Sequence, residues 1–271
     1  MAETDEISSI WYYGNDGLVS YCQGLFLDCN ARGYASVGAS YKAAIEPNTY
    51  YEGKYTIQTN NRYCYHRDSN GTIDRGSGYN NDEGYGWIVE EVSSLPVSVG
   101  ELGLAMLYSP VGLTASEGVK VYAATKNEAY NSIHFDEVEA VKAGAGVLVE
   151  AEAGTYDFAI ESNEADYESD LSGSVATVAT SSIAAAVYTL QSGPVFKQYS
   201  GETLKGFRCY AEADAGSGVK AFDVIFDDNG TGLKDLKDLK DSGELIYNIS
   251  GQRLLKAQKG VNIINGKKVL R

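Results

Sequence analysis

The chain is poor in several residue types, and each shortage narrows what the protein can do. Its 271 residues include only two histidines, two methionines and four prolines. No apolar run approaches the roughly 20 residues that a membrane-spanning helix requires. The sequence also lacks an HExxH metal motif, a nucleophile elbow and a dinucleotide-binding fingerprint. His66 and His134 have no nucleophile nearby in the sequence, so we interpret both as structural and expect no enzymatic activity.

Positive charge is also scarce. The chain has 22 Lys and Arg residues against 37 Asp and Glu residues, which gives a formal net charge of −15. Binding of phosphate groups requires a clustered excess of cations, because affinity comes largely from counterion release. Nucleic acids and anionic membrane surfaces are therefore not expected partners.

A secretory signal is not evident at the first residues. The segment from Met1 to Ile7 has neither the basic region nor the apolar region of a signal peptide. If the protein is exported, we interpret this chain as a mature, recombinant or partial form of a longer protein.

Tyrosine and glycine, in contrast, are abundant, with 21 and 30 residues. Tyrosine favours the half-buried surface of a pleated sheet, and glycine supplies the turns between strands. We therefore predict an all-β protein in three parts. They are a first part (residues 8–94, aromatic-rich), a sandwich module (residues 95–230) and a tail (residues 231–271, a linker plus a β-hairpin).

In the first part, short β runs alternate with turn clusters such as Asn15-Asp-Gly and Ser69-Asn-Gly. The predicted strands are Ile10–Tyr13, Leu18–Cys22, Leu25–Asp28, Lys54–Gln58, Arg62–His66 and Trp87–Glu91. Regularly spaced short strands are typical of a small barrel or sandwich. A seam with the next part is predicted near Ser93 to Pro96.

The sandwich module is predicted to be an antiparallel β-sandwich, because seven or more short strands fit that architecture. The predicted strands are Gly103–Val111, Val119–Thr125, Ser132–Glu139, Gly146–Glu152, Thr155–Ile160, Ile183–Gln191, Thr203–Ala213 and Val219–Asp227. Alternation is clearest in the last of these, where Phe222, Val224 and Phe226 share one face. The polar segment Asn163–Ser174 lacks periodicity and is predicted to be a loop.

The tail begins with a triplet repeat from Leu233, whose period fits neither helix nor strand and indicates a linker. It then has two β-rich runs, interrupted at Ser250-Gly251 and Asn265-Gly266. These dipeptides favour tight turns, so two hairpins are expected.

The end of the chain also carries a resemblance. The runs Leu245-Ile-Tyr-Asn-Ile-Ser-Gly-Gln-Arg and Lys259-Gly-Val-Asn-Ile-Ile-Asn-Gly-Lys-Lys-Val-Leu resemble the C-terminal tail of secreted Bacteroidetes-type surface proteins, with its "IYNxxGQR" and "KGxxIxNGKKVL" segments. The resemblance implies a secreted or cell-surface location and attachment to the cell envelope, or sorting, through the tail. The tail residues that carry it are Tyr247, Gly251, Gly260, Gly266, Lys267 and Lys268.

The sandwich module is similar to a β module that precedes this tail in the same proteins. The matching runs begin at Leu104, Val141, Gly193 and Leu204, and the departures are Met106, Lys142-Ala143 and Cys209. This resemblance implies a non-catalytic module. The first part resembles a ricin-like β-trefoil repeat, on the runs that begin at Gly53, Asn61 and Gly86. At most two of the three units that a trefoil needs are present.

The function that follows is binding or adhesion, with a glycan or a host or matrix protein as partner. Sugar faces stack on aromatic rings while amides and carboxylates bind the hydroxyls. The candidate stacking residues are Trp11, Tyr12, Tyr13, Tyr79, Tyr85 and Trp87. Alternatives are aromatic side chains that only fill the core, a structural stalk or sorting module, and a glycosidase-like enzyme with a spatial pair of carboxylates.

No organic cofactor is expected, and the candidate metal is calcium. Asp68, Asn70 and Asp74 place hard oxygen ligands around a glycine turn, although an Asx-rich turn explains the same residues. Four cysteines leave two alternatives open: a disulfide between Cys22 and Cys29 across a hairpin, or buried free thiols.

Overall fold

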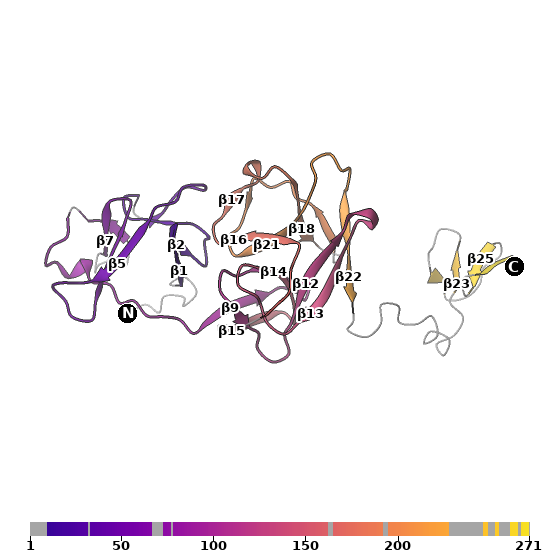
Figure 1. The fold of residues 1–271 in the computed structure, drawn as a ribbon, viewed down its shortest axis with the longest axis horizontal. Coiled ribbons are helices and arrows are strands. Elements are labelled where there is room, and N and C mark those ends of the chain that lie inside the picture. The colour runs from indigo at the N-terminus through magenta and orange to yellow at the C-terminus, as the bar shows by residue number, and fades with distance from the viewer. Residues whose placement is uncertain are drawn as a thin grey trace. The chain divides into compact units, whose positions relative to one another are not determined.

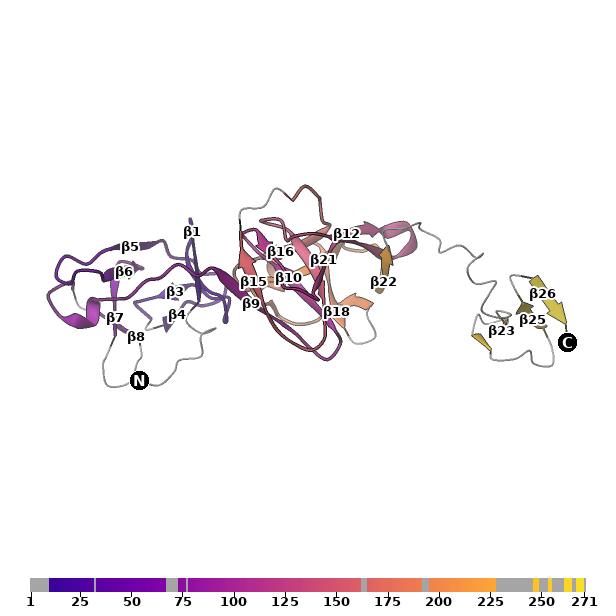
Figure 2. The same ribbon diagram turned by 90° about the horizontal axis from the view of Figure 1, so that it is seen from below.

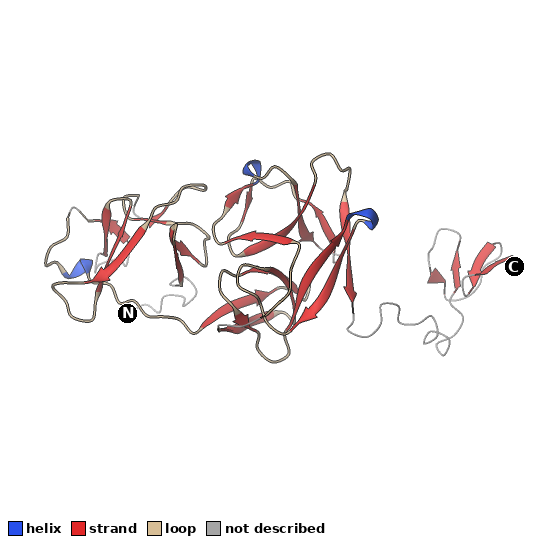
Figure 3. Ribbon diagram, viewed as in Figure 1, coloured by secondary structure: helices blue, strands red, loops and turns tan. Residues whose placement is uncertain are grey.

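The computed structural model describes residues 10–31, 33–66, 73–76, 78–161, 165–191, 195–227, 246–248, 253–254, 261–264 and 267–270. These residues form strands and turns, as Figure 3 shows, with short 3-10 segments at η2 (Glu83–Tyr85), η3 (Glu128–Tyr130) and η4 (Thr180–Ser182). The all-β prediction is confirmed. Within the described ranges, no helix has the length and hydrophobicity needed to cross a bilayer. The chain divides into two compact units, Met1–Phe226 and Asp227–Arg271.

The first part consists of small antiparallel sheets. Its strands are β1 (Trp11–Gly14), β2 (Gly17–Ser20), β3 (Leu27–Asp28), β4 (Gly33–Tyr34), β5 (Ala43–Pro47), β6 (Tyr55–Thr59), β7 (Arg62–His66) and β8 (Ile73–Arg75). Strands β1 and β2 form one hairpin, β3 pairs with β4, and β5 to β8 form a sheet in chain order (Figure 2). The β1–β2 connection is a two-residue loop, Asn15-Asp16, and Gly17 follows it with a φ of +131° that favours glycine.

A disulfide lies in the core of the first part. Cys29 and Cys64 are bonded, with their Cα atoms 5.0 Å apart, which is within the range of protein disulfides. Both lie in a cluster with Leu18 and Leu27. The predicted Cys22–Cys29 pairing is therefore wrong: Cys22 is an exposed free thiol, because Cys29 faces inward toward β7.

The sandwich module is built on a nine-stranded sheet of order β10-β14-β12-β13-β22-β19-β18-β21-β16. Its strands are β10 (Leu104–Tyr108), β12 (Lys120–Asn127), β13 (Ser132–Val138), β14 (Gly146–Glu150), β16 (Leu171–Ser174), β18 (Ala186–Gln191), β19 (Val195–Gln198), β21 (Arg208–Ala213) and β22 (Ala221–Asp227). Figure 1 shows β12, β13 and β22 side by side. The sheet nearly closes on itself, because the Tyr108 N–H at the end of β10 donates to the Phe207 carbonyl beside β21 at 3.2 Å.

Two smaller sheets complete the sandwich module. They are a sheet of order β11-β15-β9, with β9 (Ser94–Val99), β11 (Leu113–Thr114) and β15 (Gly154–Ile160), and a pair of β17 (Val178–Ala179) with β20 (Thr203–Leu204). The β9 strand contains Pro96, which a sheet tolerates on its edge because no ladder hydrogen bond is needed there. The strand begins within the predicted seam.

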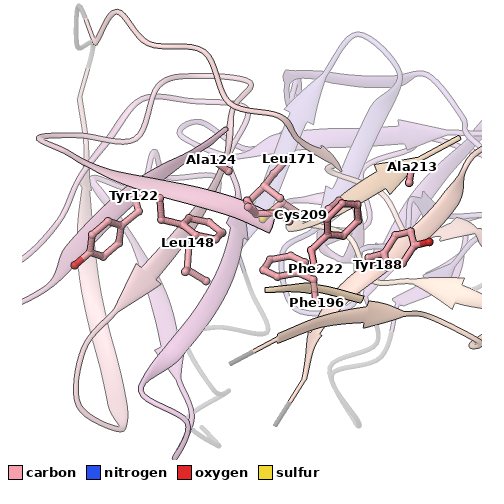
Figure 4. Close-up of a cluster of buried hydrophobic side chains, with 12 residues drawn as sticks. Tyr122, Ala124, Leu148, Leu171, Tyr188, Phe196, Cys209, Ala213 and Phe222 are labelled. Atoms are coloured by element: carbon pink, nitrogen blue, oxygen red, sulfur yellow. The ribbon is translucent and has the colours of Figure 1, made fainter. Parts of the chain in front are cut away.

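Strand β14 is buried on both faces and separates two cores. Leu148 belongs to a cluster inside the nearly closed sheet, with Phe135, Phe196 and Phe222, and Figure 4 shows part of that cluster. Val147 and Val149 face the other way, into a cluster with residues of β9 and β15. A strand that is buried on both faces needs apolar residues at successive positions, as Val147, Leu148 and Val149 provide in β14.

Three predictions about strands are corrected. Leu171–Ser174 at the end of the predicted loop is strand β16, which pairs with β21. The predicted strand Trp87–Glu91 has only an isolated bridge from Trp87 to Tyr55. The predicted strand Thr203–Ala213 is broken into β20 and β21, because Phe207 has a φ of +57°.

A loop of the first part contacts the sandwich module within the first compact unit. The Tyr21 hydroxyl donates to the Pro96 carbonyl at 2.9 Å, and its ring packs edge-on against Phe207 at 4.9 Å between centroids. The Thr177 N–H donates to the Gly24 carbonyl at 2.6 Å. A Cβ on Gly24 would lie 2.9 Å from the Gly206 Cα, so the two backbones are in direct contact. We call these residues the Tyr21 clamp.

The second compact unit contains a four-stranded sheet of order β24-β23-β25-β26. Its strands are β23 (Ile246–Asn248), β24 (Arg253–Leu254), β25 (Val261–Ile264) and β26 (Lys267–Leu270). Strand β23 pairs with β24, and β25 with β26, both antiparallel. The two predicted hairpins are confirmed. The predicted linker before them lies outside the described residues.

Candidate functional site

Five tyrosines of the first part pack together into what we call the tyrosine cluster: Tyr50, Tyr63, Tyr65, Tyr79 and Tyr85. They come from the β5–β6 turn, from β7, from the segment before η2 and from η2 itself. Ring centroids lie 5.3 Å apart for the Tyr50–Tyr79 and Tyr63–Tyr79 pairs and 5.0 Å apart for Tyr65 and Tyr85. These spacings are those of favourable edge-on and offset-stacked pairs.

Two glycines let these rings pack closely. A Cβ on Gly84 would lie 2.2 Å from Cε2 of Tyr65, and a Cβ on Gly76 would lie 2.4 Å from Cε1 of Tyr85. Neither separation is possible for a real side chain. Gly76 and Gly84, which precede and follow Tyr79 in the sequence, are therefore needed for the rings to pack this closely.

Asn48 fixes the turn that carries Tyr50. Its side chain is buried, and its Oδ1 accepts hydrogen bonds from the N–H groups of Tyr50 at 2.9 Å and Tyr51 at 3.1 Å, and from the Tyr79 hydroxyl at 3.1 Å. The Thr49 N–H donates to the same tyrosine hydroxyl at 2.7 Å. The turn holds Tyr50 in place while 54% of that residue stays exposed.

A polar strip, Asn80 to Glu83, borders the tyrosine cluster, and all four of its residues are exposed. The Asp82 carboxylate accepts hydrogen bonds from the Tyr65 hydroxyl at 3.2 Å and the Gly84 N–H at 2.9 Å. The Glu83 carboxylate pairs with the Lys54 ammonium at 2.7 Å. This hydrogen bond, together with the charge of Lys54, lowers the pKa of Glu83.

The structure separates the six predicted stacking residues. Tyr79 and Tyr85 belong to the tyrosine cluster, but Tyr85 is buried and presents no face to a ligand. Trp87 is half-buried, its indole N–H donates to the Cys64 carbonyl at 3.0 Å, and its ring packs on the core. For these two residues the structure supports the core-filling alternative.

The other three lie on the β1–β2 hairpin. Trp11 is half-buried, packs on the core and stacks on Tyr34 at 5.8 Å between ring centroids. Tyr12 is half-buried as well. Tyr13 is 54% exposed, and its hydroxyl donates to the Ala43 carbonyl at 3.3 Å.

Tyr50 was not among the predicted residues, although it is the most exposed ring of the tyrosine cluster. The available signal was the run Asn48-Thr-Tyr-Tyr-Glu-Gly, in which an asparagine precedes two tyrosines and a glycine. Asn accepts hydrogen bonds from the backbone two residues on, so this run predicts an Asx turn.

The calcium prediction remains a prediction, because Asp68 and Asn70 lie outside the described residues. Asp74 lies in β8 opposite Tyr65 and is almost buried. Within the part of the chain that the structure describes, no group of three His, Cys, Asp or Glu residues is placed to hold a metal ion.

The two histidines have structural environments. The His134 Nε2 lies 3.3 Å from the Ser132 hydroxyl, and the His66 ring packs edge-on against Trp87 at 5.4 Å. Among the tail residues, Tyr247 lies in β23, and Lys267 and Lys268 lie in β26. Gly251, Gly260 and Gly266 lie outside the described residues.

The sandwich module has an open surface pocket, which the sequence did not indicate. Leu102, Leu104 and Phe226 supply its apolar lining, and Lys120, Glu150 and Glu152 its charges. Two of these charged groups have partners, because Glu150 accepts from the Tyr122 hydroxyl at 2.5 Å and Lys120 pairs with Glu137 at 3.3 Å.

No protein family model matches this chain, and neither does any curated protein or solved structure.

Proposed function

We propose that this chain is a non-catalytic secreted or cell-surface module that binds glycans through the tyrosine cluster. The observation that carries the proposal is Tyr50, a large ring that is 54% exposed on a turn held by buried Asn48. An exposed ring beside amide and carboxylate groups offers an apolar face to the C–H groups of a sugar and hydrogen-bond partners to its hydroxyls.

Rigidity supports the same function. A ligand that binds a mobile loop must first order it, which lowers the affinity. Here Asn48 and Tyr79 fix the turn through four hydrogen bonds, to Tyr50, Tyr51, Thr49 and each other. The ring of Tyr50 is also supported from one side by Tyr79. The surface is therefore organised before a ligand arrives.

The test is a glycan-array screen of the intact chain, with and without calcium, followed by titration of any glycan that binds. The Tyr50→Ala variant should bind at least about tenfold more weakly, since loss of a stacking ring costs about 1.4 kcal/mol or more. Tyr130→Ala is the control, because that ring is 79% exposed on η3 of the sandwich module, outside the tyrosine cluster. A blank array from folded protein would contradict the proposal.

A structural stalk or sorting module is the second candidate function. It is supported by the division of the chain, in which Asp227–Arg271 forms a compact unit with its own sheet. We propose that this unit attaches the protein to the exterior of the cell envelope. Fusing it to a reporter enzyme in a Bacteroidetes host should bring the reporter to the cell surface, and reporter retained inside the cells would contradict the attachment.

A further inference from the structure

The charges beside the tyrosine cluster bear on which glycans it can take, and this inference rests on the proposed function. Lys54 is the cation that pairs with the polar strip beside the cluster, and its ammonium lies 5.4 Å from the centroid of the ring of Tyr51, the neighbour of Tyr50 in the sequence. Its charge is offset by Glu83, which pairs with it at 2.7 Å. A carboxylate or sulfate that approached Lys54 would also approach the Glu83 carboxylate.

The other cations of the first part whose side chains are described lie away from this surface. Arg62 is next to Tyr63 in β7, and successive residues of a strand face opposite sides of the sheet. Since Tyr63 stacks on Tyr79, Arg62 faces away from the tyrosine cluster. Lys42 precedes β5, at the opposite end of that strand from the turn that carries Tyr50.

Negative charge, in contrast, lies directly at the cluster. Asp82 receives its hydrogen bonds from neutral donors, the Tyr65 hydroxyl and the Gly84 N–H, so its charge is not neutralised by a cation there. The strip of Asp82 and Glu83 with Lys54 thus carries a net charge of −1. At physiological ionic strength, charges closer than about 8 Å still interact. An anionic sugar bound at the cluster would therefore be repelled by this strip.

We propose that the tyrosine cluster selects neutral glycans and rejects carboxylated or sulfated ones, and that Glu83 determines this specificity by holding Lys54. Asp82 contributes the remaining negative charge. The ligand class is a neutral oligosaccharide with an apolar pyranose face.

The test compares matched oligosaccharides in their neutral, sialylated and sulfated forms. The wild-type chain should bind the neutral form at least about tenfold more tightly, and the preference should shrink when salt is raised from about 0.05 to 0.5 M, because screening weakens repulsion. Glu83→Gln keeps the size of the side chain but releases Lys54. It should raise binding of the sulfated form and reduce the preference, and adding Lys54→Met should restore the preference.

Asp82→Asn is the matched variant, since an amide oxygen still accepts from the Gly84 N–H. It should lower the ratio of neutral to sulfated binding. Equal or tighter binding of the acidic forms by the wild type, lost on Tyr50→Ala, would overturn the selectivity while leaving glycan binding intact. An unchanged preference in Glu83→Gln would overturn the role of Glu83. Binding of neither class would overturn the proposed function together with this inference.

Discussion

The four cysteines show how environment divides one residue type into three chemical states. Cys29 and Cys64 are bonded in the core of the first part, Cys22 is exposed, and Cys209 is buried in the sandwich module. Burial raises the pKa of the Cys209 thiol from 9.0 to about 12, and its S–H donates to the Val147 carbonyl at 3.3 Å. A thiol in that environment is not nucleophilic at neutral pH, because the thiolate is the reactive form.

Thiol titration should therefore count these states. At pH 8 the folded chain should react with an aromatic disulfide reagent at one thiol, Cys22. Two thiols should react after unfolding without reductant, and all four after reduction. Cys22→Ser should abolish the reaction of the folded chain. Rapid reaction of four thiols in the unfolded, unreduced chain would contradict the Cys29–Cys64 bond.

Single residues also explain why the sequence found only part of the candidate site. Tyr79 was predicted and Tyr50 was not: the run from Asn48 indicates a turn, but tertiary packing determines which ring of the cluster stays exposed. The same packing buries Tyr85. Side-chain exposure in an aromatic-rich domain depends on partners far along the chain, such as Tyr79 and Asn48.

At the scale of strands, the sequence best predicted which side chains face the core where a strand has one buried face and one face exposed to solvent. In β22, Phe222 is fully buried and Ile225 is 39% exposed, as the alternation predicted, but Phe226, on the predicted inner face, is 37% exposed at the end of the strand. In β14 the run Gly-Val-Leu-Val-Glu predicted a strand. Because this strand is buried on both faces, its sequence does not alternate between apolar and polar residues, and it does not show which side chains face which core.

Two of the missed strands have identifiable causes. Strand β9 contains Pro96, which argues against a central strand but is tolerated at an edge. Strand β16 contains Ser172 and Gly173, which have low strand preference, and it exists because β21 offers a pairing partner from far along the chain. Pairing over such separations cannot be read from local pattern.

A matched pair of substitutions tests the assignment of β22. Phe222→Ala should lower the free energy of unfolding by about 3 to 5 kcal/mol, since it leaves a cavity beside Phe196 and Tyr188. Ile225→Ala, on the solvent side of the same strand, should change it by about 1 kcal/mol or less. Denaturant unfolding measures both. Similar losses for the two variants would show that the faces are assigned wrongly.

For the whole molecule, we expect the Tyr21 clamp to make the first part and the sandwich module unfold together. Tyr21 packs its ring on Phe207 and donates its hydroxyl to Pro96, and burial raises its pKa. We expect one cooperative transition for Met1–Phe226, because the contact couples the two cores. Because the pKa of Tyr21 is higher in the folded chain, its contribution to stability is complete below about pH 10, where the tyrosine of the unfolded chain ionises. This contribution, and with it the coupling, is lost as pH rises further.

Calorimetry of the Tyr21→Ala variant should show two transitions for Met1–Phe226 in place of one. Tyr21→Phe keeps the ring and loses one hydrogen bond, so it should keep the single transition at a stability lower by about 1 kcal/mol. Tyr13→Ala, an exposed ring in the same part, is the control. Two transitions within Met1–Phe226 of the wild type would mean that the clamp does not couple the cores.

The contact of Gly24 with Gly206 has a consequence for how such a protein can change in evolution. Two backbones that touch leave no room for even a methyl group on either side, so each glycine is constrained by a residue in the other part. Recombination that joined either part to a foreign neighbour would leave the Gly24 carbonyl and the Thr177 N–H without each other. We therefore expect the first part and the sandwich module to be retained together in related proteins, whereas gene fusion can exchange the second compact unit.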